Sequence, residues 1–284
     1  ACGYEIDRIW RVLEFEAQAK PLRELVDTAN QTIDSGDRVN MENQTKLHEW
    51  LETRLAAQSE VPTIQKLFVL SMNGTQLARV PIPSEPQVGD NFRYRDYFTG
   101  LGFDLDPEIK LADMIDEPLV GPRVYPSGVH MSSAYMSTLI DEQHLKVTFT
   151  VPIRSTDSDD VVRTIGLIGT SVEVGEVMAA TQIGDSHTWI ADLRQDMVDG
   201  RPKRGLLLHY PGTATRSEPI TGERLSSDLV EELRDKDFAS AKVLTEDWLT
   251  GISDHNSIHP VIINGRSQQP FNLGWVVITA EAEE

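Results

Sequence analysis

Side chains that could hold a small polar ligand are concentrated in two short stretches of the chain. Residues 92–98 read FRYRDYF, and residues 130–135 read HMSSAY. The planar guanidinium of Arg95 can bind a carboxylate through two hydrogen bonds. Tyrosine rings with hydroxyl tips are typical of small polar pockets, and they occur here at Tyr94, Tyr97, Tyr125 and Tyr135. The pattern predicts a ligand site anchored by Arg95; alternatively, Arg95 pairs with Asp96 or a loop acid, and the tyrosines belong to the core.

Residues suited to catalysis or metal binding are also present, in a less specific arrangement. His130, His144 and the acidic residues of 104–117 could serve a hydrolase or a metal-dependent enzyme. However, the sequence has no Gly-x-Ser-x-Gly elbow, and its single cysteine, Cys2, is at a terminus. The alternating acids that begin at Asp104 lack the glycine and final glutamate of an EF-hand loop. We therefore expect an acidic lid, with no catalytic centre, no metal site and no cofactor.

The composition restricts the class of partner. The chain has 284 residues, of which 39% are hydrophobic and 25% charged, as is typical of globular proteins. Its formal net charge of -19 disfavours nucleic acid and anionic lipid as partners, because an acidic surface repels both. An anionic ligand would therefore need a local cation. No apolar run approaches the roughly 20 residues of a membrane helix, as expected for a segment between two membrane helices or for an ordinary soluble protein.

The first sixty residues have the periodicity of amphipathic helices. Apolar side chains recur at spacings of three and four residues from Ile6 to Ile33, and again from Met41 to Leu55. Pro21 lies inside the first stripe and predicts a kink or a boundary there, because proline removes a helical hydrogen bond. The stripe is longer than one module needs to cover itself, so we expect a weak parallel homodimer through this helix.

The pattern then changes to that of β-strands. Asn73-Gly74 separates two β-rich runs and predicts a hairpin in which both turn residues take positive φ. A short helix is expected from Arg95 to Leu101, followed by a long loop over residues 102–128. The strict alternation of Leu145–Ile153 predicts a half-buried strand with one face in water.

A second, weaker cycle of strands follows Gly184. Strand-like runs occupy residues 187–192, 205–209, 259–263 and 275–280, and a helix is predicted from Ser226 to Arg234. The two cycles share an order of elements without obvious repetition of sequence. They predict two α+β modules, each with its own sheet.

In their order and spacing, these stretches resemble the double Cache (dCache) domain, the extracytoplasmic sensor of many bacterial receptors. The resemblance covers nearly the whole chain and is strongest from Gln65 to Val174, while WIAD at 189–192 and LLLHYP at 206–211 match the second module. It implies an α+β fold in which a long N-terminal helix, within residues 1–60, precedes two PAS-like modules with antiparallel sheets. Residues 61–175 would form the membrane-distal, ligand-binding module, and residues 176–284 the membrane-proximal one.

The resemblance also implies roles for individual residues. In amino-acid-binding members of the family, an arginine and an aromatic residue two positions later hold the ligand carboxylate, while a later tyrosine and an aspartate hold the amine. Arg95, Tyr97 and Tyr135 match the first three positions. Ser171 stands near the position of the aspartate, and its hydroxyl cannot neutralise an ammonium; Glu173, on the same strand face, is the alternative. The expected ligand is therefore a small polar or carboxylate-bearing metabolite.

The function implied by the resemblance is that of a sensor and not of an enzyme. The chain would lie on the periplasmic or extracellular side of the bacterial inner membrane, flanked by transmembrane helices in the full-length protein. Its partners would be a small-molecule ligand and a second copy of the chain, with no nucleic acid. A hydrolase or metal-dependent enzyme, and a ligand-free dimerisation module, are the alternatives.

Overall fold

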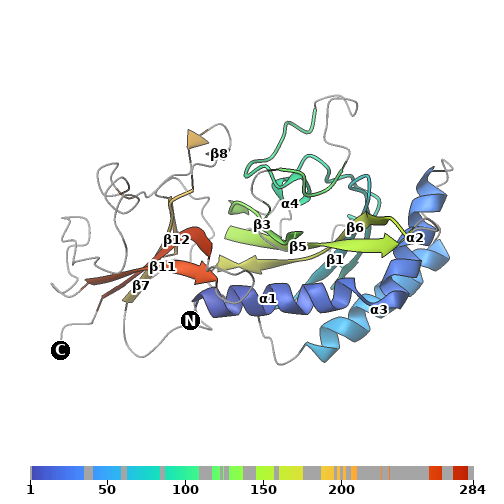
Figure 1. Cartoon of the computed structure of the whole chain (residues 1–284), viewed down its shortest axis with the longest axis horizontal. Helices are drawn as coiled ribbons and strands as arrows, with labels where there is room; N and C mark the ends of the chain where they lie inside the picture. The colour runs from blue at the N-terminus through green and yellow to red at the C-terminus, as the bar shows by residue number, and fades with distance from the viewer. Residues whose placement is uncertain are drawn as a thin grey trace. The chain divides into compact units, whose positions relative to one another are not determined.

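The computed structural model of the chain divides into two compact units (Figure 1). The N-terminal unit consists of residues 8–133 and 146–172, and the C-terminal unit of residues 1–7, 134–145 and 173–284. The structure describes residues 2–34, 41–58, 63–83, 87–108, 117–121, 124, 128–136, 145–156, 160–174, 187–194, 197–198, 201–202, 206–209, 225, 230, 256–263 and 271–280. The sheets of the two units are separate, as the two cycles of strands predicted.

The N-terminal stripe forms two helices, α1 (Cys2–Ala17) and α2 (Lys20–Asp34), so Pro21 marks a boundary, which is one of the two predicted outcomes, and not a kink within one helix. The helix is interrupted at Gln18 and Ala19, just ahead of Pro21. The missing N–H of Pro21 therefore falls in the first turn of α2, where a backbone N–H has no partner within the helix. Most apolar side chains of the stripe are at most 5% exposed, while Leu25 is half-buried; the buried ones are Ile6, Ile9, Trp10, Leu13, Ala17, Leu22, Val26 and Ala29. Most of the stripe is therefore covered by its own chain, which weakens the reason for expecting a homodimer through it; the homodimer itself stays a prediction.

Helix α3 (Met41–Ala57) is joined to α1 by a partly buried ion pair. Nε and Nη2 of Arg54 donate to the two carboxylate oxygens of Glu16, each at 2.7 Å, and Gln58 Nε2 donates to Glu16 at 3.0 Å. The Glu16 side chain is fully buried. Three hydrogen bonds thus compensate the cost of removing this carboxylate from water.

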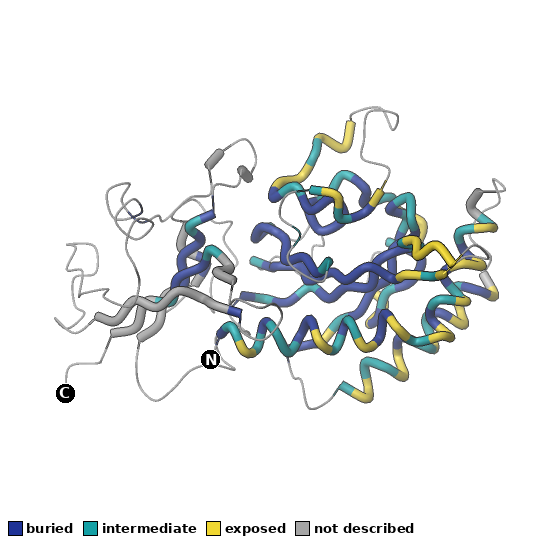
Figure 2. The backbone as a smooth tube through the Cα atoms, viewed as in Figure 1, coloured by how far each residue is buried: buried dark blue, intermediate teal, exposed yellow. Residues whose placement is uncertain are grey.

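The N-terminal unit is built around an antiparallel sheet in the order β2-β1-β6-β5-β3; the short strand β4, within residues 134–145, also pairs with β5. The strands are β1 (Leu67–Ser71), β2 (Gln76–Val80), β3 (His130–Met131), β4 (Tyr135–Met136), β5 (Leu145–Thr156) and β6 (Val162–Glu173). In Figure 2 the strands of this sheet are buried along most of their length. The sheet is therefore the centre of the core of this unit.

The predicted hairpin joins β1 to β2, but its turn differs from the expected one. Only Gly74 has positive φ, at 85°. Gly74 N–H donates to Ser71 O at 3.1 Å, and Ser71 N–H donates to Thr75 O at 2.8 Å. Met72 and Asn73 therefore form the turn, and Gly74 follows as a bulge that restores the pairing of the strands.

Helices cover one face of this sheet, and α4 (Asp96–Thr99) lies on the other (Figure 1). On the helix side, the Trp10 ring meets Phe149 of β5 edge to face, with centroids 5.7 Å apart. Helix α2 also packs closely on this face, since a Cβ on Gly166 of β6 would lie 3.1 Å from Val26 Cγ1. The elements around α4 therefore cover the face of β5 that was expected to be in water.

That second face of β5 is buried and polar. Lys146, Thr148 and Thr150 are 1%, 0% and 0% exposed, so the expectation of a wet face is wrong. Thr150 Oγ1 donates to Tyr97 O of α4 at 2.9 Å. Polar side chains thus face the interior of the unit, where each needs a partner.

The C-terminal unit has a four-stranded antiparallel sheet in the order β10-β7-β12-β11 and a separate pair, β8 and β9. The strands are β7 (His187–Asp192), β8 (Met197–Val198), β9 (Arg201–Pro202), β10 (Leu206–His209), β11 (Asn256–Ile263) and β12 (Phe271–Ala280). The helix predicted over residues 226–234 lies outside the described residues, apart from Val230. None of the helices in the described ranges has both the length and the apolar character that spanning a membrane requires.

Candidate functional site

Helix α4 places the predicted anchor, Arg95, at its N-cap. The backbone is extended at Arg95 (φ -74°, ψ 145°) and becomes helical at Asp96. The helix ends at Gly100, which has φ 75° and whose N–H donates to Asp96 O. A left-handed residue favours glycine, because it has no Cβ. The expected helix from Arg95 to Leu101 is therefore present as a single turn, with Arg95 and Gly100 as its caps.

Arg95 is bound by a carboxylate of the following loop. Its Nη1 lies 2.6 Å from Asp104 Oδ2, and its side chain is 12% exposed. The guanidinium also lies over the Tyr94 ring, 5.1 Å from the centroid. Burial lowers the pKa of Arg95, but the Asp104 carboxylate and the neighbouring tyrosines outweigh it and hold that pKa above its ordinary value. The cation predicted from the sequence is thus present and charged, with Asp104 of the predicted lid as its partner.

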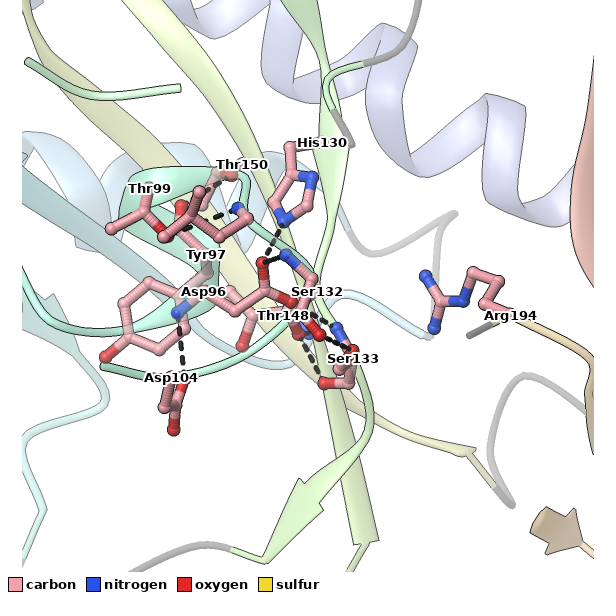
Figure 3. A network of polar contacts seen from close by, with 12 residues as sticks. Asp96, Tyr97, Thr99, Asp104, His130, Ser132, Ser133, Thr148, Thr150 and Arg194 are labelled. Atoms are coloured by element: carbon pink, nitrogen blue, oxygen red, sulfur yellow. Dashed lines mark hydrogen bonds and ion pairs between the residues drawn. The ribbon is translucent and has the colours of Figure 1, made fainter. Parts of the chain in front are cut away.

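The Asp96 carboxylate connects three separate segments of the chain (Figure 3). Its Oδ1 accepts a hydrogen bond from Gly102 N–H at 2.7 Å and lies 3.1 Å from His130 Nε2. Its Oδ2 accepts from Ser133 N–H at 2.6 Å. Figure 3 shows the carboxylate between His130 and Ser133, so one side chain joins α4, the lid and the segment that begins with β3.

The Asp96 carboxyl is ionised in this setting. Burial alone would raise its pKa, but the His130 imidazole and the backbone N–H groups of Ser133 and Gly102 lower it to about 2. Hydrogen bonds to the charged form favour that form. The site therefore contains a buried negative charge that is compensated locally.

Hydroxyl groups continue this network onto the sheet. Ser132 Oγ donates to Ser133 O at 2.8 Å and accepts from Thr148 N–H at 2.9 Å. Thr148 Oγ1 lies 2.8 Å from Ser171 Oγ of β6. Ser171 is thus held on the buried polar face of β5 and β6, with a neutral hydroxyl beside it.

The predicted site residues fall into two groups. Tyr94 contacts Arg95, and Tyr97 packs against Phe68 and Phe92, with centroids 5.8 and 6.4 Å apart. Tyr135 lies in β4, and Ser171 lies in β6, where its hydroxyl contacts Thr148. Tyr125 lies outside the described residues. The ligand site composed of Tyr94, Arg95, Tyr97, Tyr125, Tyr135 and Ser171 stays a prediction.

Sequence reasoning missed the central position of Asp96, which was considered only as a partner for Arg95. The available signal was an aspartate at the start of a short helix, followed closely by Gly100 and Gly102, whose backbone can approach a carboxylate. His130 was noted only as a residue for the enzyme alternative. In the structure it is bound to Asp96, while its companion His144 lies outside the described residues. Within the described ranges, no three His, Cys, Asp or Glu side chains gather so that they could hold a metal ion.

Comparisons with known proteins find similarity in structure alone. No protein-family model and no curated protein matches the sequence. A domain of a sensory box/GGDEF family protein from Vibrio parahaemolyticus aligns over 99% of this chain and 92% of its own, with a TM-score of 0.50 and 12% identity.

Two further solved structures align with lower TM-scores. The ligand-binding domain of an amino-acid chemoreceptor from Pseudomonas aeruginosa, in complex with GABA, has a TM-score of 0.47 and 10% identity over 99% of this chain and 94% of its own. An extracellular ligand-binding receptor from Desulfohalobium retbaense has a TM-score of 0.46 and 11% identity; the alignment covers 96% of this chain and only 40% of that receptor. In element order, in its two antiparallel sheets and in its likeness to the Vibrio domain, this chain has the same α+β fold as that domain.

Proposed function

We propose that the chain is the extracytoplasmic ligand-sensing domain of a membrane receptor and binds a small polar or carboxylate-bearing metabolite in its N-terminal unit. It is not itself an enzyme, and it passes a conformational change to an output domain elsewhere in the full-length protein. Transmembrane helices flank it there, and it lies on the periplasmic or extracellular side of the bacterial inner membrane. The fold supports a sensor, because Cache-type domains of this architecture occur in chemoreceptors and histidine kinases.

The position of Arg95 is the main support for the proposed ligand site. Its guanidinium is largely buried, lies over an aromatic ring, and is held by an acid of the loop that would cover the ligand. In a chain of net charge -19, only such a local cation can attract an anion. A ligand carboxylate could take the place of Asp104 on the guanidinium, so that binding and lid movement are the same event.

The chemistry near Ser171 supports a ligand without a positive charge. The Ser171 hydroxyl is within hydrogen-bond distance of Thr148 Oγ1, and this pair carries no negative charge. A buried ammonium would need a carboxylate there. We therefore expect acetate or succinate to bind more tightly than GABA, which carries an amine.

Calorimetry with acetate, succinate and GABA as probes tests this proposal. Arg95→Ala should weaken binding of the best probe by about 30-fold or more, because losing one partner of a buried charged pair costs several kcal/mol. Arg79→Ala is the matched control, since it removes the same charge from β2, where Arg79 binds Gln87. Unchanged affinity in Arg95→Ala, with a fold shown to be intact by circular dichroism, would remove this site.

We also propose that two copies of the chain associate weakly through α1, by its outer face and not by the stripe that is buried. Tyr4 and Phe15 are 69% and 67% exposed, and eleven residues on one helix place them on the same side. Arg8 and Arg11 lie between them on that side, and Glu5, Asp7 and Glu14 flank it. The exposed Tyr4 and Phe15 rings are the apolar surface that a second copy would cover.

A further inference from the structure

A continuous series of buried contacts runs from helix α1 to the loop that follows α4. At the α1 end, Trp10 Nε1 donates a hydrogen bond to the backbone oxygen of His130 at 3.0 Å. The Trp10 ring is fully buried and packs edge to face on Phe149. Because its ring is fixed by packing, Trp10 moves with β3 and β5.

His130 links this helix contact to the acid of α4. Its backbone oxygen accepts the hydrogen bond from Trp10, and its side-chain Nε2 lies 3.1 Å from Asp96 Oδ1. The His130 and Asp96 side chains are 0% and 3% exposed. A buried charged contact of this kind is costly to separate, so the two residues are expected to move together.

Asp96 links His130 to the loop at residues 101–104. Its carboxylate accepts from Gly102 N–H at 2.7 Å, and its own N–H donates to Asp104 Oδ1 at 2.8 Å. Ser133 closes the connection, because its Oγ donates to Gly102 O at 2.6 Å while its N–H binds Asp96. Asp104 therefore contacts both Arg95, the proposed ligand anchor, and the backbone N–H of Asp96.

We propose that Asp96 and His130 are positioning residues that couple the loop at 101–104 to helix α1. The inference rests on the proposed function for its purpose, namely that a ligand on Arg95 would release Asp104. The coupling itself is a property of the unliganded protein. When the ion pair between Asp104 and Arg95 weakens, Gly102 and Asp96 move. His130 then moves with Asp96 and changes its hydrogen bond with Trp10.

The test uses the indole N–H of Trp10, observed by nuclear magnetic resonance in the chain without any ligand and assigned with Trp10→Phe. Asp104→Asn removes the charge that holds Arg95 but keeps an oxygen for the Asp96 N–H. It should speed hydrogen exchange at the Trp10 indole by about fivefold or more, the lower end of typical coupling between sites. Asp106→Asn, a change in the same loop at an acid whose described contact is with Glu108 N–H, should leave this rate unchanged.

A second pair of variants tests the path. His130→Gln can still donate from an amide nitrogen to Asp96 and should preserve the response to Asp104→Asn, whereas His130→Leu should abolish it. Equal responses in both backgrounds, or no change at Trp10 in Asp104→Asn, would overturn the coupling. If a His130 variant fails to fold, the comparison of Asp104→Asn with Asp106→Asn still decides the matter. Since no ligand is used, failure here is separate from failure of the Arg95 site in calorimetry.

Discussion

Asp96 carries a negative charge in a place that water hardly reaches. It is 2% exposed, and its ionised form depends on His130 and on two backbone N–H groups. Arg95, the next residue towards the N-terminus, carries a positive charge bound by Asp104. Opposite charges on adjacent residues are therefore each bound by a residue from another part of the chain.

Asp96→Asn is expected to change how stability depends on pH. The pKa of Asp96 is about 2 in the folded chain, against 3.8 for an ordinary aspartate. The ionised Asp96 therefore adds about 2 kcal/mol to the free energy of unfolding above about pH 4. This stabilisation is lost as the pH falls towards 2. Urea unfolding at a series of pH values should show a wild-type advantage near neutral pH that shrinks in acid. A constant difference from pH 7 to pH 2 would contradict this account, and Asp106→Asn serves as the control.

Among the helices, α1 and α3 are held together by a charged contact as well as by apolar side chains. Glu16 is fully buried, while Arg54 is 31% exposed at its side chain. The Arg54 guanidinium also lies 5.9 Å from the Phe15 ring centroid. Removing Arg54 would leave the Glu16 carboxylate inside the protein with only Gln58 as its described donor.

Arg54→Met should therefore lower the free energy of unfolding by about 2 kcal/mol, somewhat less than is typical for breaking a fully buried pair. Lys46→Met on the same helix is the matched control. Lys46 pairs with Glu42 at a similar 2.7 Å, but both side chains are exposed. Such surface pairs contribute little to stability, because water screens their charges. Equal losses in denaturant titrations of the two variants would show that burial of Glu16 does not matter.

The turn between β1 and β2 offers a second test at the level of elements. Gly74 has φ 85°, and a Cβ on it would lie 2.6 Å from Arg93 Cβ and Arg93 N. Gly74→Ala should cost about 2 kcal/mol or more, since strain adds to the collision. Gly89→Ala separates the two effects, because φ there is 96° and a Cβ would meet nothing within 4 Å. It should cost only about 1 kcal/mol, and a larger loss at Gly89 than at Gly74 would refute the turn geometry.

For the molecule as a whole, the two units have separate sheets, and the N-terminal unit holds all the residues that we place in the coupled network. The outer face of α1 is the proposed contact between copies. An excised receptor domain loses the high local concentration of the membrane, so its self-association is expected to be weak.

The combined change Tyr4→Glu and Phe15→Glu should abolish self-association, because it adds acids beside Glu5, Asp7 and Glu14. Sedimentation velocity over a range of protein concentrations would measure the loss. Ile82→Glu is the control, since Ile82 is also 67% exposed but lies outside the helices. A wild-type chain that remains monomeric at the highest concentrations, or a dimer that survives the combined change, would refute the interface.

The sequence by itself determined the class of fold. The helical spacing from Ile6 to Ile33, the Asn73-Gly74 hairpin and the strand at residues 187–192 are all present in the structure. These are local patterns, because the hydrogen bonds and side-chain faces of one element follow from residues that are close in the chain. Arg95 was predicted as the cation of the site from its chemistry and from the family resemblance, and the structure places it at the N-cap of α4.

Only the tertiary structure decided which polar residues meet. Asp96, Gly102, His130 and Ser133 are up to 37 residues apart, and their contacts depend on how the loop and β3 return to α4. Likewise, alternation showed that Thr148 and Thr150 face away from Phe149, but not that other segments cover them. Periodicity specifies the direction of a side chain relative to its own strand. Whether that direction leads to water or to a partner depends on segments distant in the chain, which a local pattern does not contain.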